Sequence, residues 1–332
     1  MPWSDSVTFL IAAAAACLVS LLVTAGARNY ALRRGMIDQP GARRSHTQPT
    51  PRGGGIGIAI ACLLACLYLA WRDGASWAFV ALGLVLVAAV GWCDDHRALS
   101  PLGRLLAHVL AGICLAVGMA LHGAGTMGAL LALLAVPVLV NVWNFMDGID
   151  GLAASQAALC AAALTLLVAG GWGLLAVVLC AACVGFLPFN LPRARIFLGD
   201  VGSGALGYVL AALAVVGLQG RPFADWPLVL LPLSAFLVDA ALTLLWRMRR
   251  GEAWWQPHVQ HLYQQASRRH GHLRVSAAYA GWTLAAIALM LVSFTWSDVL
   301  AMLAALGWMV TAALLWCWRH HGDEGKSEGF GS

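Results

Sequence analysis

Apolar segments of about 20 residues recur along almost the whole 332-residue chain, and no other feature constrains the fold so strongly. A helix of roughly 20 residues is needed to cross the ~30 Å hydrocarbon core of a bilayer, where lipid offers no partner to unpaired backbone groups. Hydrophobic residues make up 61% of the chain and charged residues only 11%, which leaves no room for a separate soluble domain. We therefore predict an all-α integral membrane protein, a polytopic bundle of about eleven transmembrane helices at residues 7–27, 53–71, 75–93, 104–121, 125–143, 151–169, 172–191, 202–219, 226–246, 275–293 and 298–318.

The basic residues predict the orientation of this bundle. With eleven spans, eighteen of the 20 lysines and arginines fall on one side of the membrane, and only Arg72 and Arg221 fall on the other. Cytoplasmic loops carry the excess of Lys and Arg, so we expect a periplasmic amino terminus and a cytoplasmic carboxyl terminus in the inner (plasma) membrane. Residues 1–318 would form one polytopic domain, and residues 319–332 a polar cytoplasmic tail that we expect to be disordered. The net charge of +5 then reflects topology and contact with the lipid bilayer, and we expect no nucleic acid partner.

Five carboxylates lie at the cytoplasmic ends of the predicted spans: Asp94, Asp95, Asp147, Asp150 and Asp200. An ionised carboxylate near hydrocarbon costs several kcal/mol unless it is hydrated, paired or bound to a metal. The adjacent pair Asp94 and Asp95 repel each other unless a cation or a proton lies between them, although ordinary loop acids are the simpler alternative. Together the five predict a cytoplasmic site for a divalent cation and a phosphate-bearing substrate.

Two glycine-containing segments have the composition of an anion site. Residues 51–55 read Pro-Arg-Gly-Gly-Gly, and the basic residues Arg43, Arg44 and His46 precede them. Arginine beside exposed backbone amides suits a phosphate or pyrophosphate, so Arg52 and Gly53 are candidate substrate ligands. A second segment places Arg195 shortly before Gly199-Asp200 at the start of a predicted span. A basic loop that faces the inner leaflet is the alternative for the arginines.

A polar repeat joins the fifth and sixth predicted spans. Asn141, Asn144, Asp147 and Asp150 are spaced by three residues, so they line nearly one face wherever this segment is helical. Amide and carboxylate oxygens are hard ligands that suit magnesium or the hydroxyl groups of a sugar. Asp150 could instead serve only as the N-cap of the following span.

The last cytoplasmic segment carries His258 and His261, which share one face of a short amphipathic helix. They could contact phosphate oxygens; zinc is less suitable because no thiolate or third histidine accompanies them, and a solvated loop is the alternative. Asp239 stands deep in the ninth predicted span, where an acid marks either function or a pairing with a polar group of a neighbouring helix.

These segments together resemble the polyprenyl-phosphate N-acetylhexosamine-1-phosphate transferases, that is, glycosyltransferase family 4. The resemblance covers about residues 36–285 and depends most on the patterns Asn-x-x-Asn-x-x-Asp-Gly-x-Asp-Gly-Leu at 141–152 and Gly-Asp-x-Gly-Ser at 199–203. The branch that initiates O-antigen synthesis is the most similar, because it shares the Pro-Arg-Gly-Gly-Gly loop and the His-x-x-His-Leu-Tyr-Gln segment at 258–264. The phospho-MurNAc-pentapeptide transferases have a lysine after the aspartate pair, where this chain has Arg97.

Several residue roles follow from the resemblance. It implies that Asn144 and Asp200 bind Mg²⁺, with Mn²⁺ as an alternative, and that Asp94 and Asp95 face a lipid phosphate. The remaining candidates would contact the sugar nucleotide: Asp147, Asp150, His258 and His261, with Arg52, Gly53, Asn141 and Arg195 as further substrate contacts. Relatives often place arginine between the two histidines, whereas this chain has Val259.

The resemblance implies a Mg²⁺-dependent enzyme that transfers an N-acetylhexosamine 1-phosphate from a UDP-sugar to undecaprenyl (polyprenyl) phosphate, releases UMP and initiates synthesis of O-antigen or another cell-envelope polysaccharide. The sugar is left open among GlcNAc, FucNAc and QuiNAc. The oligomeric state is also open, and a homodimer is compatible with the sequence. The alternatives are a cation-coupled membrane transporter, for which Asp239 in a water-filled path would argue, and a phospho-MurNAc-pentapeptide transferase.

Overall fold

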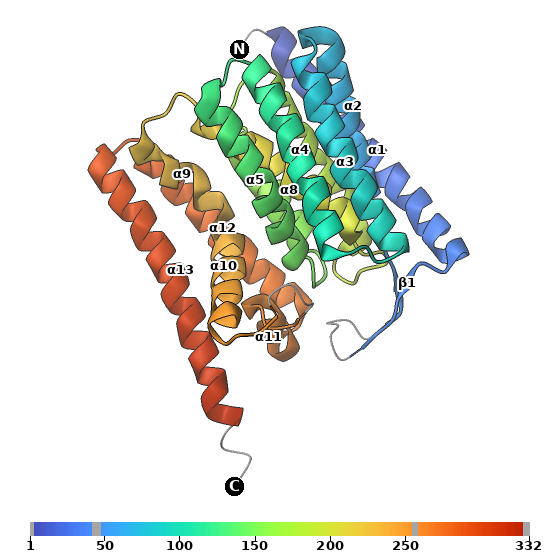
Figure 1. Cartoon of the computed structure of the whole chain (residues 1–332), viewed down its shortest axis with the longest axis vertical. Coiled ribbons are helices and arrows are strands. Elements are labelled where there is room, and N and C mark those ends of the chain that lie inside the picture. The colour runs from blue at the N-terminus through green and yellow to red at the C-terminus, as the bar shows by residue number, and fades with distance from the viewer. Residues whose placement is uncertain (1–2, 42–47, 254–257, 328–332) are drawn as a thin grey trace.

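The computed structural model describes residues 3–41, 48–253 and 258–327. The predicted phosphate ligands at Arg43, Arg44 and His46 lie outside these ranges. The elements follow in the order α1 Trp3–Arg34, β1 Ile37–Asp38, β2 Thr50–Pro51, α2 Ile56–Asp73, α3 Ser76–His96, α4 Pro101–Leu121, α5 Gly125–Phe145, α6 Leu152–Leu164, α7 Gly170–Asn190, α8 Gly199–Leu218, α9 Trp226–Leu230, α10 Ser234–Arg249, α11 Leu262–His270, α12 His272–Ser293 and α13 Asp298–Ser327. The two short strands pair antiparallel, with Ile37 opposite Pro51, and form a small hairpin beside the bundle (Figure 1).

The helical prediction is confirmed, although three of the spans differ from their predicted form. Ten helical segments of the described chain are long and apolar enough to cross a membrane. The sixth predicted span, at 151–169, contains only the 13-residue helix α6, which is about 20 Å long at ~1.5 Å per residue. This helix is buried along most of its length, so apolar composition reflects packing against other helices here and not contact with lipid.

The ninth span is also interrupted. A short helix α9 and a 3₁₀ turn at Leu231–Leu233 precede α10, and the break falls at Pro232. Proline lacks the amide proton that a continuous helix needs and clashes with the preceding turn, which explains the interruption. The last helix, α13, continues to Ser327, beyond residue 318 where the sequence predicts the last span to end.

Helix α8 is the centre of the bundle and is buried along nearly its whole length. It contacts α2, α3, α5, α6, α7 and α9, while α10, α12 and α13 form a second group at one side (Figure 1). Small residues allow this close packing: a Cβ atom at Gly207 would lie 2.5 Å from the carbonyl oxygen of Leu139 in α5. Interfaces of this kind are typical of membrane helices, which associate through backbone proximity and van der Waals contact.

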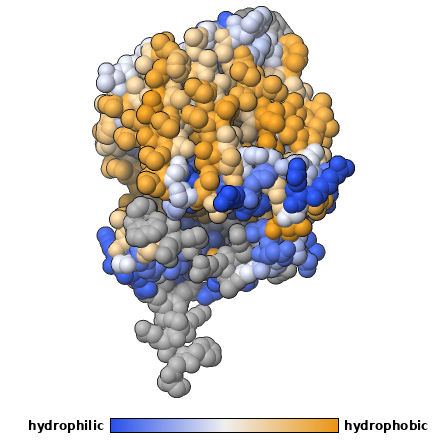
Figure 2. Space-filling model, turned by 45° about the vertical axis from the view of Figure 1, so that its right-hand side comes forward, coloured by the Kyte–Doolittle hydropathy of each residue, from blue (hydrophilic) through white to orange (hydrophobic). Residues whose placement is uncertain are grey.

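Hydrophobic side chains cover a broad band of the surface, and hydrophilic side chains gather below it (Figure 2). Because neighbouring helices alternate in direction, the carboxyl-terminal ends of α3 and α5 meet the amino-terminal ends of α4 and α8 at this polar side. The predicted acids therefore come from different helices to one end of the bundle.

Candidate active site

Asp95 holds two of these helix ends together. Its side chain lies at the end of α3, is 1% exposed, and accepts hydrogen bonds from the backbone amides of Asp200 (3.0 Å) and Val201 (3.2 Å) at the start of α8. The first amides of a helix have no partner within the helix, so a carboxylate here both satisfies them and interacts favourably with the helix dipole. The carboxylate oxygens of Asp95 are therefore already used inside the protein.

Asp94 is placed differently. Its Oδ1 accepts a hydrogen bond from the amide of Leu99 at 2.6 Å, and its Oδ2 lies 3.2 Å from Nη1 of Arg104. The guanidinium of Arg52 donates to the backbone carbonyls of Asp94 (2.7 Å) and Asp95 (3.0 Å), which ties the glycine-rich segment to the end of α3. A polar cavity of about 490 Å³ opens beside these groups, lined by Arg34, Arg52, Asp94, Asp95 and His96 among others.

Asn144 and Asp200 form the pair that the resemblance predicts as metal ligands. The amide of Asn144, near the end of α5, donates to Oδ1 of Asp200 at 2.6 Å and to the hydroxyl of Ser203 at 3.2 Å. The second carboxylate oxygen of Asp200 lies 4.0 Å from Nη1 of Arg104, which also contacts Asp94. Mg²⁺ takes one or two carboxylates together with waters and phosphate oxygens, so this oxygen-rich group fits such an ion. Among the described residues, no three His, Cys, Asp or Glu side chains form a complete metal centre by themselves.

The glycine-rich segment runs alongside the start of α8. The amide of Gly54 donates to the carbonyl of Phe197 (2.9 Å), and that of Gly55 donates to Leu198 (2.8 Å). Gly199 has φ +76°, and a Cβ atom there would lie 2.6 Å from a carboxylate oxygen of Asp95 and 2.8 Å from the amide nitrogen of Gly53. Only glycine suits this position, because other residues rarely adopt positive φ and no space is left for a side chain.

Asp147 lies in the turn between α5 and α6, one turn beyond Asn144. Burial raises its pKa to about 8, and the negative charges of Asp95 and Asp150 contribute to the increase. Among the described residues, none donates a hydrogen bond to its carboxyl group. Asp147 is therefore available to a ligand.

Asp150 has structural partners of its own. Its Oδ2 accepts a hydrogen bond from the amide of Ala194 (3.1 Å), and Nδ1 of His272 lies 3.2 Å from its Oδ1. Its carbonyl accepts a hydrogen bond from Ser276 at 2.9 Å. Asp150 thus joins the loop before α8 to the start of α12. It is not the N-cap of α6, because Gly151 holds that position, and its contact with the sugar nucleotide stays a prediction.

The two histidines lie together next to the turn after α5. Their ring centroids are 4.8 Å apart, and the ring of His261 stacks on Phe145 with centroids 6.0 Å apart. The hydroxyl of Tyr263 donates to the carbonyl of Phe145 at 2.9 Å, which fixes α11 against this turn. Burial lowers the pKa of His258 to about 4, and His261 and Arg247 add to the decrease, so His258 is neutral near pH 7.

Asp239 is hydrogen-bonded within the protein, which agrees with the expectation that it pairs with polar groups of neighbouring segments. It accepts hydrogen bonds from the backbone amides of Leu262 (2.9 Å) and Tyr263 (3.2 Å) and from the hydroxyl of Tyr279 (2.7 Å). Nδ1 of His261 lies 3.6 Å from its Oδ1. Asp239 therefore caps α11 and positions His261, and these bonds leave it no evident part in an ion path.

Two residues predicted to contact substrate, Asn141 and Arg195, have side chains that bond to other parts of the protein. The amide of Asn141 donates to the carbonyl of Pro137 in its own helix at 2.7 Å. The guanidinium of Arg195 donates to the carbonyl of Pro188 and lies 5.1 Å from the ring centroid of Phe189. In this structure neither side chain contacts the acid cluster.

Sequence reasoning missed Arg104 and Ser203 as members of the site. In the sequence, Arg104 is one of the basic residues that predict the orientation in the membrane, and in the structure it bridges Asp94 and Asp200. It lies one turn into α4, after the short loop that follows the last turn of α3 with its two aspartates, and a basic residue so close to two acids was the available signal. Ser203 is the serine of the Gly-Asp-x-Gly-Ser pattern, and its hydroxyl faces Asn144.

Comparison with known proteins agrees with this geometry. The sequence model of glycosyl transferase family 4 matches residues 77–218, which contain the acid cluster. The chain is 33% identical over 306 residues to a decaprenyl-phosphate N-acetylglucosaminephosphotransferase of Mycolicibacterium smegmatis, covering 77% of this chain and 75% of that one. It is 29% identical over 309 residues to the protein of that name in Mycobacterium tuberculosis (78% and 76% covered). It is 31% identical over 328 residues to a phospho-N-acetylmuramoyl-pentapeptide-transferase of Synechococcus sp., with 91% of each chain covered. The chain therefore belongs to glycosyl transferase family 4, within the superfamily of polyprenyl-phosphate N-acetylhexosamine-1-phosphate transferases.

Proposed function

We propose that the protein transfers an N-acetylhexosamine 1-phosphate from a UDP-sugar to polyprenyl phosphate at the cytoplasmic side of the inner membrane. The observation that carries this proposal is the convergence of Asp94, Asn144 and Asp200 from three helices, with Arg52 and Arg104 among them. A site with hard oxygen ligands and two guanidinium groups suits two phosphate-bearing substrates. Membership of the family supplies the reaction class.

In the proposed reaction, an oxygen of the lipid phosphate attacks the β-phosphorus of the UDP-sugar. The bond between the β-phosphorus and the bridging oxygen breaks, UMP leaves with that oxygen, and polyprenyl-diphospho-sugar is formed. Asp94 accepts the proton of the lipid phosphate, because Asp95 is already engaged by the amides of α8. A two-step route through an aspartyl-phosphate is the alternative.

The other residues bind and orient the substrates. Oxygens of Asp200 and Asn144 would hold Mg²⁺, which supplies charge neutralisation for the diphosphate and the departing UMP. Arg34 and Arg52 line the 490 Å³ cavity beside Asp94, where the lipid phosphate would lie. Neutral His258, together with His261, would donate hydrogen bonds to the diphosphate of the sugar nucleotide. Most of the catalysis would then come from positioning and electrostatics.

The sugar and the pathway are part of the proposal. We propose GlcNAc, FucNAc or QuiNAc as the sugar and initiation of O-antigen or a related cell-envelope polysaccharide as the role. The support is the sequence of the histidine segment and of the Pro-Arg-Gly-Gly-Gly loop. Since relatives of the phospho-N-acetylmuramoyl-pentapeptide class also match, UDP-MurNAc-pentapeptide is the competing donor.

The test is UMP release by the purified protein with undecaprenyl phosphate, Mg²⁺ or Mn²⁺, and each of these donors in turn. We expect release that requires lipid phosphate, metal and one N-acetylhexosamine donor. Asp200→Asn should lower the rate by at least 10³-fold if it holds the ion. Asp298→Asn, the same change at an exposed acid in the first turn of α13, should leave it unchanged. An Asp200→Asn protein with near-normal turnover would contradict the assignment, and release only with UDP-MurNAc-pentapeptide would replace the proposed donor.

A further inference from the structure

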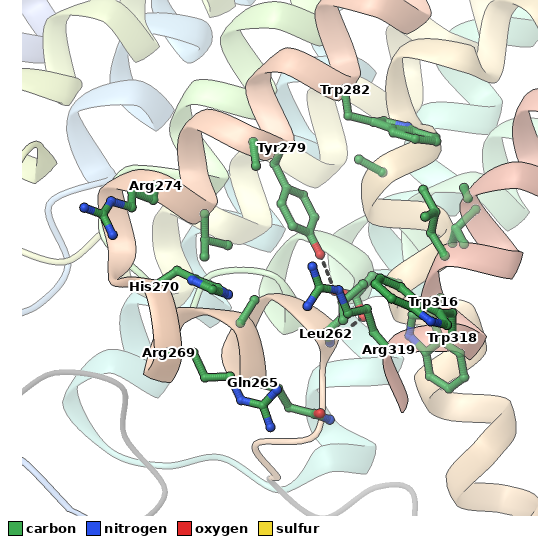
Figure 3. Close-up of a pocket in the computed structure, with 18 residues that line it drawn as sticks. Leu262, Gln265, Arg269, His270, Arg274, Tyr279, Trp282, Trp316, Trp318 and Arg319 are labelled. Atoms are coloured by element: carbon green, nitrogen blue, oxygen red, sulfur yellow. Dashed lines mark hydrogen bonds between the residues drawn. The ribbon is translucent and has the colours of Figure 1, made fainter. Parts of the chain in front are cut away.

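The end of α1 forms one wall of the polar cavity beside Asp94. Tyr30 and Arg34, one turn apart in this helix, line the cavity of about 490 Å³ together with Asp94 and His96 of α3. A second cavity, of about 520 Å³, lies between α10, α11, α12 and α13, and none of its lining residues comes from α3, α5 or α8 (Figure 3). The cavity beside α1 is therefore the one that gives a phosphate access to Asp94.

Arg34 brings a positive charge to this cavity. It lies in the last turn of α1, its side chain is exposed, and its guanidinium carbon lies 5.8 Å from the ring centroid of Tyr30. Among the described residues, none forms an ion pair with Arg34. A guanidinium group suits phosphate, because two of its N–H groups can donate in parallel to two phosphate oxygens. Arg34 is therefore available to an anion in the cavity.

The carboxylates of the cavity wall do not neutralise this charge. Asp94 pairs with Arg104 at 3.2 Å, and Asp95 pairs with Arg52 at 3.3 Å. Asp38 also lines the cavity and is not free. Because each of these acids already has a partner, the guanidinium at the end of α1 is left for a ligand.

A side-chain hydrogen bond joins this end of α1 to α3. The hydroxyl of Tyr30 lies 3.2 Å from Nε2 of His96, and Nδ1 of His96 lies 2.8 Å from the carbonyl oxygen of Trp92. A carbonyl oxygen can only accept, so a neutral His96 carries its proton on Nδ1 and accepts at Nε2 from the hydroxyl of Tyr30. The three rings also pack together, with centroids 5.7 Å apart for Tyr30 and Trp92 and 4.6 Å apart for Trp92 and His96. The ring of Tyr30 is thus fixed in place and in direction.

These contacts determine where Arg34 lies relative to Asp94. Helix α1 packs along α2 and α7, and its last three residues, 32–34, are exposed. Tyr30 holds this end to α3, and the face of its ring attracts the guanidinium of Arg34. A change in the position of Tyr30 would therefore move Arg34 within the cavity.

The location of this wall favours a lipid phosphate over the sugar nucleotide. Leucines on the outer face of α1, among them Leu10, Leu18 and Leu22, are exposed, as expected for a spanning helix that borders hydrocarbon. The histidine segment, which we propose contacts the sugar nucleotide, belongs with α11 across the molecule from the end of α1 (Figure 1). A polyprenyl tail can thus lie along α1 while its phosphate enters the cavity.

We propose that Tyr30 and His96 are positioning residues that hold Arg34 against the phosphate of the polyprenyl phosphate. The inference rests on the proposed function, because this lipid is the acceptor substrate of that reaction. Arg34 donates to the phosphate oxygens on the side of the cavity that faces away from α8. Since Tyr30 donates its hydroxyl proton to His96, it has none to offer the phosphate and acts through Arg34.

The test is a double-mutant cycle on the full-length protein in detergent, with UMP release as the readout. Arg34→Gln should raise the KM for undecaprenyl phosphate roughly tenfold, because a charged hydrogen bond is lost, without raising the KM for the UDP-sugar. Tyr30→Phe removes only the hydroxyl and should raise the same KM roughly threefold, and His96→Phe, which removes the acceptor, should do likewise. In the Arg34→Gln background, Tyr30→Phe should have no further effect, because both changes act on one contact.

The matched control is Tyr68→Phe in α2. Arg72 lies 5.5 Å from the ring centroid of Tyr68, so this pair repeats the stack of Tyr30 and Arg34. It lies at the end of α2 remote from the glycine-rich segment, and neither residue lines the cavity. The control should leave the KM for undecaprenyl phosphate unchanged.

Native mass spectrometry with undecaprenyl phosphate and with undecaprenol separates the inference from the reaction. Arg34→Gln should weaken retention of undecaprenyl phosphate and not of undecaprenol, whether or not UMP is released. If the parent turns over and Arg34→Gln changes neither retention nor KM, or raises only the KM for the UDP-sugar, the inference is overturned and the proposed function stands. Additive effects of Tyr30→Phe and Arg34→Gln would overturn the positioning role. A parent that releases no UMP would contradict the function, and the retention experiment would still decide the inference.

Discussion

Gly91 of α3 is the residue whose substitution tests the proposed site most directly. A Cβ atom at this position would lie 2.4 Å from the carbonyl oxygen of Asp200 and 2.5 Å from the amide nitrogen of Val201. All of these are backbone atoms, so no side chain can rotate away. Gly91→Ala must therefore separate α3 from the start of α8, although Gly91 itself contacts no substrate in the proposed reaction.

The size of the displacement follows from the contact distance. Ordinary contact begins near 3.4 Å, so the two segments must move apart by about 1 Å. The hydrogen bonds that Asp95 accepts from α8, at 3.0 and 3.2 Å, would then exceed the usual range. The carboxylate of Asp200 would move away from Asp94, and a misplacement of about 1 Å in a catalytic site can cost about 100-fold in rate.

The assay is the UMP-release rate at saturating substrates, with thermal unfolding in detergent as a check on folding. The control is Gly281→Ala in α12, because a Cβ atom there would meet no heavy atom within 4 Å. Alanine is favoured over glycine within a helix by about 1 kcal/mol, so the control should be at least as stable as the parent and fully active. If Gly91→Ala retained more than half of the parent rate, the close contact between α3 and α8 would have no catalytic significance.

Three further predictions follow from the contacts around the site. Asp239→Asn removes the charge that caps α11, so the free energy of unfolding should fall by about 1–3 kcal/mol in denaturation experiments, and an unchanged value would contradict the capping role. Because the pKa of His258 is about 4 in the folded protein and ~6.5 in an unfolded chain, the unfolded state binds more protons between these values. The parent should therefore lose stability as the pH falls from 6.5 to 4, by about 1–2 kcal/mol because water screens part of the effect at this half-buried ring, whereas His258→Gln should lack this part of the loss; identical melting profiles would refute it. Arg104→Gln should reduce kcat/KM at least tenfold because Arg104 faces both Asp94 and Asp200, while exposed Arg97→Gln should reduce it less than twofold.

The sequence predicted the membrane class and most of the spans because membrane insertion is a local property. A window of about 20 residues is either apolar enough to cross the bilayer or it is not, and no partner helix needs to be known. The same window could not distinguish lipid contact from burial among helices, which is why the span at 151–169 proved to be the short helix α6. The positions of the acids at span ends predicted that Asp94 and Asp200 lie on one side of the membrane, and the family resemblance implied that Asn144 and Asp200 meet.

What each acid does was decided by the tertiary structure. Asp94 and Asp95 are adjacent in sequence, yet one faces Arg104 and the other caps α8. Asp150 and Asp239 stabilise segments next to the site. Each accepts a hydrogen bond from a backbone amide distant in sequence, that of Ala194 for Asp150 and that of Leu262 for Asp239. The role of a carboxylate depends on which donors reach it, and those donors are set by the packing of helices far apart in the sequence. Composition and spacing place the acids at one end of the bundle, and only the packing of α3, α5 and α8 distinguishes those that can meet a substrate from those that hold the protein together.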